Sequence, residues 1–121
     1  MKIQGKIVHG RGVGKQLGFP TANIEISAID IEPGVWACLF SFNHSTYPAV
    51  ANIGSCPTFG VKKANIEVHV IGLNEDIYET DAEIKPIKKL REIRKFSKVE
   101  ELTAQITKDV EKTKEILSEL L

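Results

Sequence analysis

The sequence has 121 residues with 16 Lys+Arg against 16 Asp+Glu, and 42% of its residues are hydrophobic, a composition typical of one globular domain. A domain of this length buries roughly two-thirds of the surface of its unfolded chain, which is enough to fold without disulfides or a structural metal. A formal net charge of zero argues against a general nucleic-acid binder, which needs a basic excess to neutralise phosphates. We therefore expect one domain, over residues 1–121, that binds no nucleic acid.

The cysteines and the N-terminus predict a cytoplasmic protein. Cys38 and Cys56 lack CxxC spacing, so they indicate neither a zinc site nor a disulfide framework. The segment MKIQGKIVHG has no apolar stretch of signal-peptide length, and no window approaches a membrane span. We expect a reducing setting, buried free thiols, no membrane association and a monomer.

The first part of the chain has the two-residue periodicity of β-strands, from residue 2 to about 90. At its start, Ile3, Gly5 and Ile7 fall on one face. Residues 35–42 are apolar on both faces, which predicts a central strand.

Further strands are predicted at residues 47–53, 65–71 and 82–90, with turns at residues 43–45 and 56–60. Pro86 has no backbone N–H to donate to a ladder, so the last of these strands is expected at an edge or a bulge.

The C-terminal segment has helical periodicity. Ser97 and Glu100 have the spacing of a capping box, which predicts the start of a helix. Apolar residues recur after it at helical spacing: Val99, Leu102, Ile106, Val110, Leu117 and Leu120. The pattern predicts a mainly β protein, with a small antiparallel barrel over about residues 1–95 and an amphipathic helix over about residues 98–120.

A glycine-rich segment follows the first strand. Four of the nine glycines lie between Gly10 and Gly18, with Lys15 among them. Such a loop can bring backbone N–H groups against a phosphate, with the lysine as a point charge. The segment matches neither the P-loop nor the GxGxxG motif. Taken alone, a flexible turn therefore remains the alternative interpretation.

The next segment, GFPTAN, places Thr21 and Asn23 on the same side of an extended chain. A hydroxyl and an amide oxygen are hard donors that suit Mg²⁺ when substrate phosphates and water complete its shell. The alternative is a local Asx or ST turn, in which each side chain bonds the nearby backbone.

The segment NIEVHVI places Glu67 and His69 on the face opposite Ile66, Val68 and Val70. A carboxylate in mid-strand beside an apolar wall is a candidate general base. The alternative is a solvated strand face, since glutamate is commonly exposed.

The order of five segments resembles the riboflavin kinase (flavokinase) family: GRGVGKQLGFPTAN, NIGSCPTFG, IEVHV, DIYE and LREIRKF, the last leading into the predicted helix. The PTAN and EVH elements are more specific as a pair than either is alone, and the resemblance spans nearly the whole chain. It favours the functional interpretations over the structural alternatives. It implies a six-stranded antiparallel Greek-key barrel with a C-terminal α-helix.

The resemblance also implies roles for individual residues. Glu67 aligns with the catalytic base, Thr21 and Asn23 with the Mg²⁺ and nucleotide ligands, and Gly10 and Lys15 with the phosphate-contacting loop. The nucleotide pocket corresponds to Val70, Gly72 and Tyr78, and the flavin contacts to Arg91, Arg94 and Phe96. Two positions depart from the family pattern: Glu79 replaces a glycine, and Ile93 replaces an acidic residue.

The activity implied is transfer of the γ-phosphoryl group of ATP to the ribityl 5′-hydroxyl of riboflavin, giving FMN. Its ligands would be riboflavin or FMN and ATP or ADP, with Mg²⁺ accompanying ATP and no permanently bound cofactor. Bacterial relatives commonly carry an FMN adenylyltransferase domain, which these residues do not include, so we expect the kinase domain alone, either as a lone kinase or as a fragment of a bifunctional enzyme. The alternative is a non-catalytic flavin- or nucleotide-binding module of the same fold.

Overall fold

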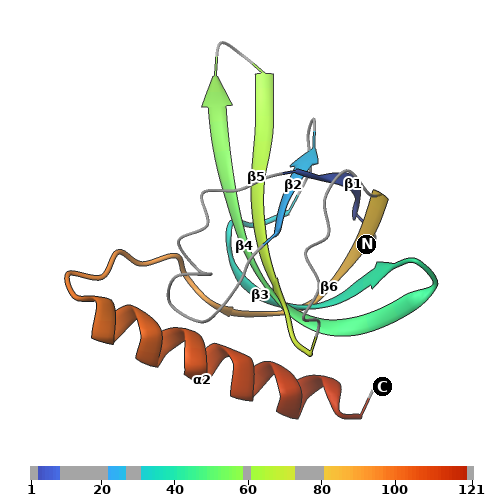
Figure 1. The fold of residues 1–121 in the computed structure, drawn as a ribbon. Coiled ribbons are helices and arrows are strands. Elements are labelled where there is room, and N and C mark those ends of the chain that lie inside the picture. The colour runs from blue at the N-terminus through green and yellow to red at the C-terminus, as the bar shows by residue number, and fades with distance from the viewer. Residues whose placement is uncertain (1–2, 9–21, 27–30, 59–60, 73–80, 120–121) are drawn as a thin grey trace.

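The computed structural model describes residues 3–8, 22–26, 31–58, 61–72 and 81–119 (Figure 1). These residues form strands β1 (Ile3–Val8), β2 (Ala22–Ile26), β3 (Gly34–Phe42), β4 (Ser45–Thr58), β5 (Val61–Val70) and β6 (Asp81–Arg91), followed by helix α2 (Val99–Leu117).

The six strands close into an antiparallel barrel in the order β1-β2-β5-β4-β3-β6. Strands β3, β4 and β5 follow one another as a meander, and β6 returns to lie beside β3, which is a Greek-key arrangement. The expected mainly β fold, a six-stranded antiparallel Greek-key barrel with a C-terminal α-helix, is therefore confirmed.

The barrel interior holds the hydrophobic core. Alternate residues of each strand point inward, because successive side chains in a strand face opposite sides. Fully buried members include Ile7 of β1, Phe40 of β3, Ile53 of β4, Ile66 of β5 and Ile84 of β6. Closing the sheet around these side chains leaves Glu67 and His69 of β5 on the outer face.

Strand β3 is covered on both of its faces, as its two apolar sides predict. Cys38 and Phe40 lie in the barrel core, whereas Val35 and Ala37 lie on the alternate face and are also buried. Helix α2 packs on β3 and β4 at this outer face (Figure 1), where Val50 is the direct cross-strand neighbour of Ala37. Leu117, at the end of the helix, is buried, which stabilises the packing of α2 on the barrel.

Two turn predictions have different outcomes. Asn43 and His44 form the predicted turn between β3 and β4, with φ angles of 50° and 65°. The turn expected at residues 56–60 is wrong for residues 56–58. Strand β4 continues through Pro57, which is paired with Lys62 of β5, and the long β4–β5 pair extends beyond the barrel (Figure 1). Cross-strand pairing outweighed the local turn signal.

Strand β6 has the bulge that Pro86 predicts. Pro86 is paired with Cys38, and the β3–β6 register shifts between Ala37 and Cys38. Strand β6 is paired with β1 as far as Ile84, so among the described residues Pro86 is paired with β3 alone.

The predicted capping box is wrong. The helix begins one residue after its N-cap, Lys98, which makes no side-chain capping bond. The Ser97 hydroxyl instead donates to a carboxylate oxygen of Glu101, at 3.5 Å. The acidic Glu100 and Glu101 in the first turn still favour the helix start through its dipole.

The buried stripe of α2 also differs from its apolar stripe. Its buried residues are Asp109, Thr113 and Leu117, whereas Val99 is 58% exposed. The helix therefore buries a carboxylate and a hydroxyl that the apolar periodicity does not reveal. No helix in the described part of the chain combines the length and apolar character needed to cross a membrane.

Candidate functional site

Asn23 and Glu67 lie directly opposite each other on neighbouring strands. They are cross-strand partners in the antiparallel β2–β5 pair. Directly opposed side chains project to the same face of a sheet, with Cβ atoms about 4.5–5.5 Å apart. The adjacent Ile24, Ile66 and Val68 are buried in the core, so Asn23 and Glu67 face outward. Both are half-buried.

Asn52, which the sequence analysis did not single out, is the neighbour of Glu67 on the other side. It is the cross-strand partner of Glu67 in the β4–β5 pair and is exposed. Glu67 therefore lies between two asparagine amides on the outer face. Alternation along β4 could have shown that Asn52 faces outward, but only the strand register places it beside Glu67.

The same cross-strand row continues to β6. Asn52 is paired with Val35 of β3, and Val35 with Arg91 of β6. One line across the outer face thus joins the candidate base, Glu67, to the first of the candidate flavin contacts, Arg91. The two residues lie three strands apart, so they belong to separate parts of this face.

Two expected nucleotide-pocket residues lie at the end of β5. The side chain of Val70 is buried in the barrel core, so it does not share the outer face with Glu67. Gly72 is exposed, has a φ of 86°, and has open space where a Cβ would lie. A left-handed φ favours glycine at this turn. The other expected residues, Gly10, Lys15, Thr21 and Tyr78, lie outside the described residues.

The three candidate flavin residues are brought together at the end of β6 and in the segment that joins it to α2, residues 92–98. The guanidinium carbon of Arg94 lies 5.3 Å from the centre of the Phe96 ring, and that of Arg91 lies 5.8 Å from it. Such distances are within the range of cation–π attraction. Phe96 is half-buried and Arg94 is exposed.

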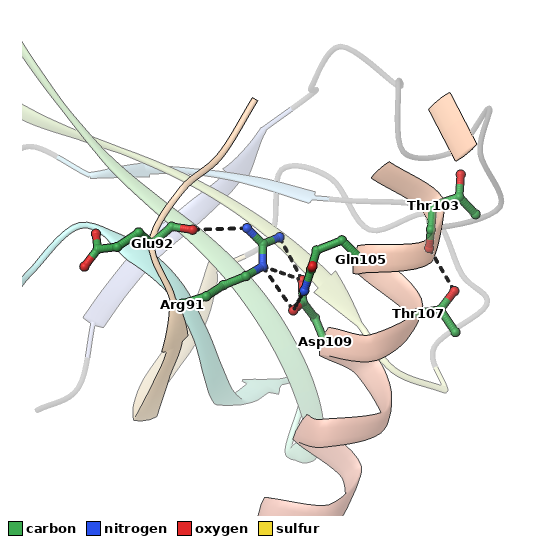
Figure 2. A network of polar contacts seen from close by, with 6 residues as sticks. All are labelled: Arg91, Glu92, Thr103, Gln105, Thr107 and Asp109. Atoms are coloured by element: carbon green, nitrogen blue, oxygen red, sulfur yellow. Dashed lines mark hydrogen bonds and ion pairs between the residues drawn. The ribbon is translucent and has the colours of Figure 1, made fainter. Parts of the chain in front are cut away.

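Arg91 is also bonded to the helix (Figure 2). Its Nε donates to both carboxylate oxygens of Asp109 at 3.1 and 3.2 Å, and its Nη2 donates to Asp109 Oδ2 at 2.8 Å. Its Nη1 donates to the Glu92 carbonyl at 3.1 Å. On the helix, Gln105 donates to Asp109 Oδ1 at 3.0 Å.

A second charged cluster holds the start of the 92–98 segment. Lys89 Nζ donates to Glu32 at 2.6 Å and to Glu92 at 2.5 Å. These two hydrogen bonds raise the pKa of Lys89 above its usual value. Gly34 allows the lysine to pass, because a Cβ there would lie 2.5 Å from Lys89 Cε.

Other features of the described residues carry none of the expected chemistry. Burial raises the pKa of the Cys38 thiol to about 12, so it is an inert core group. No group of three or more His, Cys, Asp or Glu among the described residues could hold a metal ion. A surface hollow of about 620 Å³ lies beside the β3–β4 turn and the starts of β1 and β6, and none of the candidate site residues lines it.

Comparison with known proteins identifies the family. The riboflavin kinase (Flavokinase) family profile matches residues 1–117. The chain is 38% identical over 109 residues to the RNA-binding riboflavin kinase RibR of Bacillus subtilis, covering 89% of this chain and 47% of that protein. It is 39% identical over 112 residues to the bifunctional riboflavin kinase/FMN adenylyltransferase of the same organism, covering 88% of this chain and 35% of that protein.

Two solved structures have a similar fold. The riboflavin kinase of Trypanosoma brucei matches with a TM-score of 0.67 and 25% identity, over 97% of this chain and 79% of that one. A Streptococcus pneumoniae structure described as a macrolide-efflux protein matches with a TM-score of 0.85 and 30% identity, over 93% of this chain and 38% of that one.

The chain spans less than half the length of these two Bacillus subtilis relatives. The profile match nevertheless covers almost every residue of the barrel and helix, including the strands that carry Asn23, Glu67 and Arg91. The chain belongs to the riboflavin kinase (flavokinase) family.

Proposed function

We propose that this chain is a riboflavin kinase, which transfers the γ-phosphoryl group of ATP to the ribityl 5′-hydroxyl of riboflavin and releases FMN and ADP. The relatives named as riboflavin kinases support the reaction. The observation that carries the proposal is the pairing of Asn23 with Glu67 on neighbouring strands. This pairing puts a carboxylate beside an amide on one half-buried outer face.

Glu67 is the proposed proton acceptor. As the 5′-oxygen of riboflavin forms its bond to the γ-phosphorus and the bond to the β-phosphate oxygen breaks, the hydroxyl proton passes to the Glu67 carboxylate. Phosphoryl transfer depends mainly on positioning and on charge stabilisation. A carboxylate fixed in the middle of a strand suits that task, because the β2 and β4 ladders on either side hold its backbone.

The donor set around Asn23 fits Mg²⁺ bound together with ATP. An amide oxygen is a hard ligand without charge, and Mg²⁺ retains its waters unless phosphates replace them. We propose that Asn23, with Thr21 from the preceding segment, holds the ion against the nucleotide. The bound ion would neutralise charge on the transferring phosphoryl group.

Binding of the two substrates is proposed at separate ends of the outer face. The proposed nucleotide contacts are Gly10, Lys15, Gly72 and Tyr78, together with the backbone of Val70, whose side chain lies in the barrel core. Arg91, Arg94 and Phe96 are the proposed flavin contacts, supported by their grouping at the end of β6.

The wider properties of the chain also remain predictions: that residues 1–121 form a single domain, and that it acts as a cytoplasmic monomer without nucleic acid. One relative is named RNA-binding, so RNA binding is worth measuring.

The experiment is incubation of the purified chain with riboflavin and either MgATP or MgCTP, followed by chromatographic separation of FMN. Formation of FMN in proportion to enzyme, with one donor preferred, is the expected result. The alternative, a non-catalytic flavin- or nucleotide-binding module, would bind flavin without forming FMN from either donor.

A further inference from the structure

Asp109 is a buried carboxylate that the proposed reaction does not use. It lies in the middle of α2, and its side chain is only 6% exposed. We propose that Asp109 is a positioning residue for flavin binding, which acts through Arg91 to hold Phe96 in place. This inference rests on the proposed flavin site at residues 91–96.

The first step is the rigidity of the Asp109–Arg91 pair (Figure 2). Three hydrogen bonds join two nitrogens of Arg91 to the two carboxylate oxygens, and Gln105 donates to one of these oxygens from the preceding helical turn. A bidentate arginine–carboxylate pair fixes both the distance and the plane of the guanidinium. Burial strengthens this constraint because little water is available to replace either partner.

The second step joins Arg91 to the segment that carries Phe96. Strand β6 ends at Arg91 and the helix begins at Val99, so residues 92–98 lie outside both elements. Arg91 Nη1 donates to the Glu92 carbonyl, and the guanidinium lies 5.8 Å from the Phe96 ring centre. The plane set by Asp109 therefore helps to set the position of the ring.

The third step concerns the hydrogen bonds that Arg91 already makes within the protein. Its Nε and Nη2 are engaged by Asp109, and Nη1 is engaged by the Glu92 carbonyl. Arg94, by contrast, is exposed and lies 5.3 Å from the same ring. Arg91 thus positions Phe96 in addition to its own proposed flavin contact, whereas the exposed Arg94 guanidinium is placed to meet the ligand directly.

The inference predicts that a substitution at Asp109 affects flavin binding selectively, because its partner Arg91 is remote from Glu67. Arg91 and Glu67 are three strands apart in the barrel. Losing the Asp109 charge should therefore weaken flavin binding and leave the nucleotide site and the phosphoryl step unchanged. A purely structural role would instead lower all of these together with thermal stability.

The test compares Asp109→Asn with Asp109→Glu and with the control Asp81→Asn. The first substitution keeps the shape and removes the charge, the second restores the charge on a longer side chain, and the control makes the same chemical change at an exposed position of β6. Dissociation constants for riboflavin and FMN are measured by flavin fluorescence, and those for MgADP by calorimetry. All are measured at a temperature where circular dichroism shows every variant folded.

Asp109→Asn should weaken riboflavin and FMN binding about tenfold, as expected when a charge-assisted contact is lost, with MgADP binding unchanged. Asp109→Glu should recover most of the affinity, and Asp81→Asn should match the wild type. Where FMN formation is measured, the KM for riboflavin should rise while kcat stays the same. Should Asp109→Asn not fold, Arg91→Lys provides the same test, because an ammonium cannot bind both carboxylate oxygens in the fork geometry of arginine.

Unchanged flavin affinity in Asp109→Asn, or in Arg91→Lys where that variant is used, would overturn the inference. Equal weakening of flavin and MgADP binding would overturn it as well, since that result marks a structural role. A wild-type chain that binds flavin but forms no FMN would contradict the proposed kinase activity. In that case the fluorescence measurements would still decide the role of Asp109.

Discussion

The backbone of Glu67 is held by the strands on both sides of it. Its backbone is paired with β2 on one side and with β4 on the other, and the flanking Ile66 and Val68 are buried in the core. A side chain anchored in this way has little freedom to move away from a substrate. This anchoring supports the proposed role of Glu67 as the proton acceptor.

Glu67→Gln should therefore keep flavin and nucleotide binding but lose most turnover. The substitution preserves the shape of the side chain and removes its ability to accept a proton, a contribution typically worth about 10² to 10⁴-fold in rate. Steady-state kinetics with riboflavin and MgATP measure the loss, and flavin fluorescence measures binding. A kcat close to that of the wild type would show that Glu67 is not the base.

Burial of Cys38 is expected to make the free energy of unfolding depend on pH in the alkaline range. Burial raises its pKa from 9.0 to about 12, so the folded protein keeps the thiol proton over a range in which the unfolded chain releases it. The folded state binds more protons in this range, and the free energy of unfolding must fall as pH rises. The stabilisation is complete below pH 9 and is lost between pH 9 and 12.

Cys38→Ala should remove this pH dependence. Urea unfolding under reducing conditions, from pH 8 to pH 11, should show the wild type losing about 1.4 kcal/mol more per pH unit above pH 9 than the variant. The comparison cancels the contribution of Lys89, which both proteins contain. Parallel stability curves for the two proteins would contradict the assignment of a buried neutral thiol.

At the scale of elements, α2 combines favourable packing with one unfavourable polar group. Leu117 is buried against the barrel, and Asp109 is paired with Arg91. The hydroxyl of Thr113, by contrast, is fully buried, and the described residues provide no hydrogen-bond partner for it. Burying a hydroxyl without a partner costs free energy that an apolar group of the same shape avoids.

Thr113→Val should therefore stabilise the protein. We expect the free energy of unfolding to rise by about 1 kcal/mol and the midpoint of thermal unfolding by about 4 °C. Thr107→Val is the matched control on the same helix, because the Thr107 hydroxyl is exposed and donates to the Thr103 carbonyl at 2.9 Å. A stability change at Thr113 no larger than at Thr107 would show that the buried hydroxyl carries no penalty.

At the scale of the whole molecule, strand pairing aligns candidate site residues that lie far apart in the sequence. The row from Asn23 through Glu67, Asn52 and Val35 to Arg91 crosses five strands. Helix α2 then joins the end of this row through Asp109. Because Val35 is buried in the middle of this row, we expect metal and nucleotide binding at its Asn23–Glu67 end and flavin binding at its Arg91 end.

Binding of Mg²⁺ should depend on the nucleotide. Asn23 is uncharged, and the described residues hold no cluster of acidic or histidine ligands that could bind the ion alone. Calorimetry should show weak or undetectable Mg²⁺ binding to the free protein and clear binding once ADP is present. Asn23→Ala should weaken the second step, while Asn52→Ala, the same change on the other side of Glu67, should leave it intact.

Tight Mg²⁺ binding by the nucleotide-free protein would contradict this assignment. If Asn23→Ala and Asn52→Ala weakened Mg²⁺ binding in the presence of ADP equally, Asn23 would not be a specific ligand of the ion.

The two-residue periodicity by itself determined that this is a β protein, and it placed Ile66 and Val68 on one face with Glu67 on the other, because the alternation of side chains is a local property of an extended chain. Helical spacing of apolar residues likewise determined the C-terminal helix. The family resemblance added the six-stranded Greek-key topology of the barrel.

Only the tertiary structure decided which residues meet. The Asn23–Glu67 and Asn52–Glu67 pairs depend on register between strands that are distant in the sequence, and no local pattern specifies that register. Pairing with β5 likewise carried β4 through Pro57, where the local residues predicted a turn. The burial of Asp109 could not be predicted either, because a carboxylate in a helix is normally exposed unless a partner such as Arg91 arrives from another element.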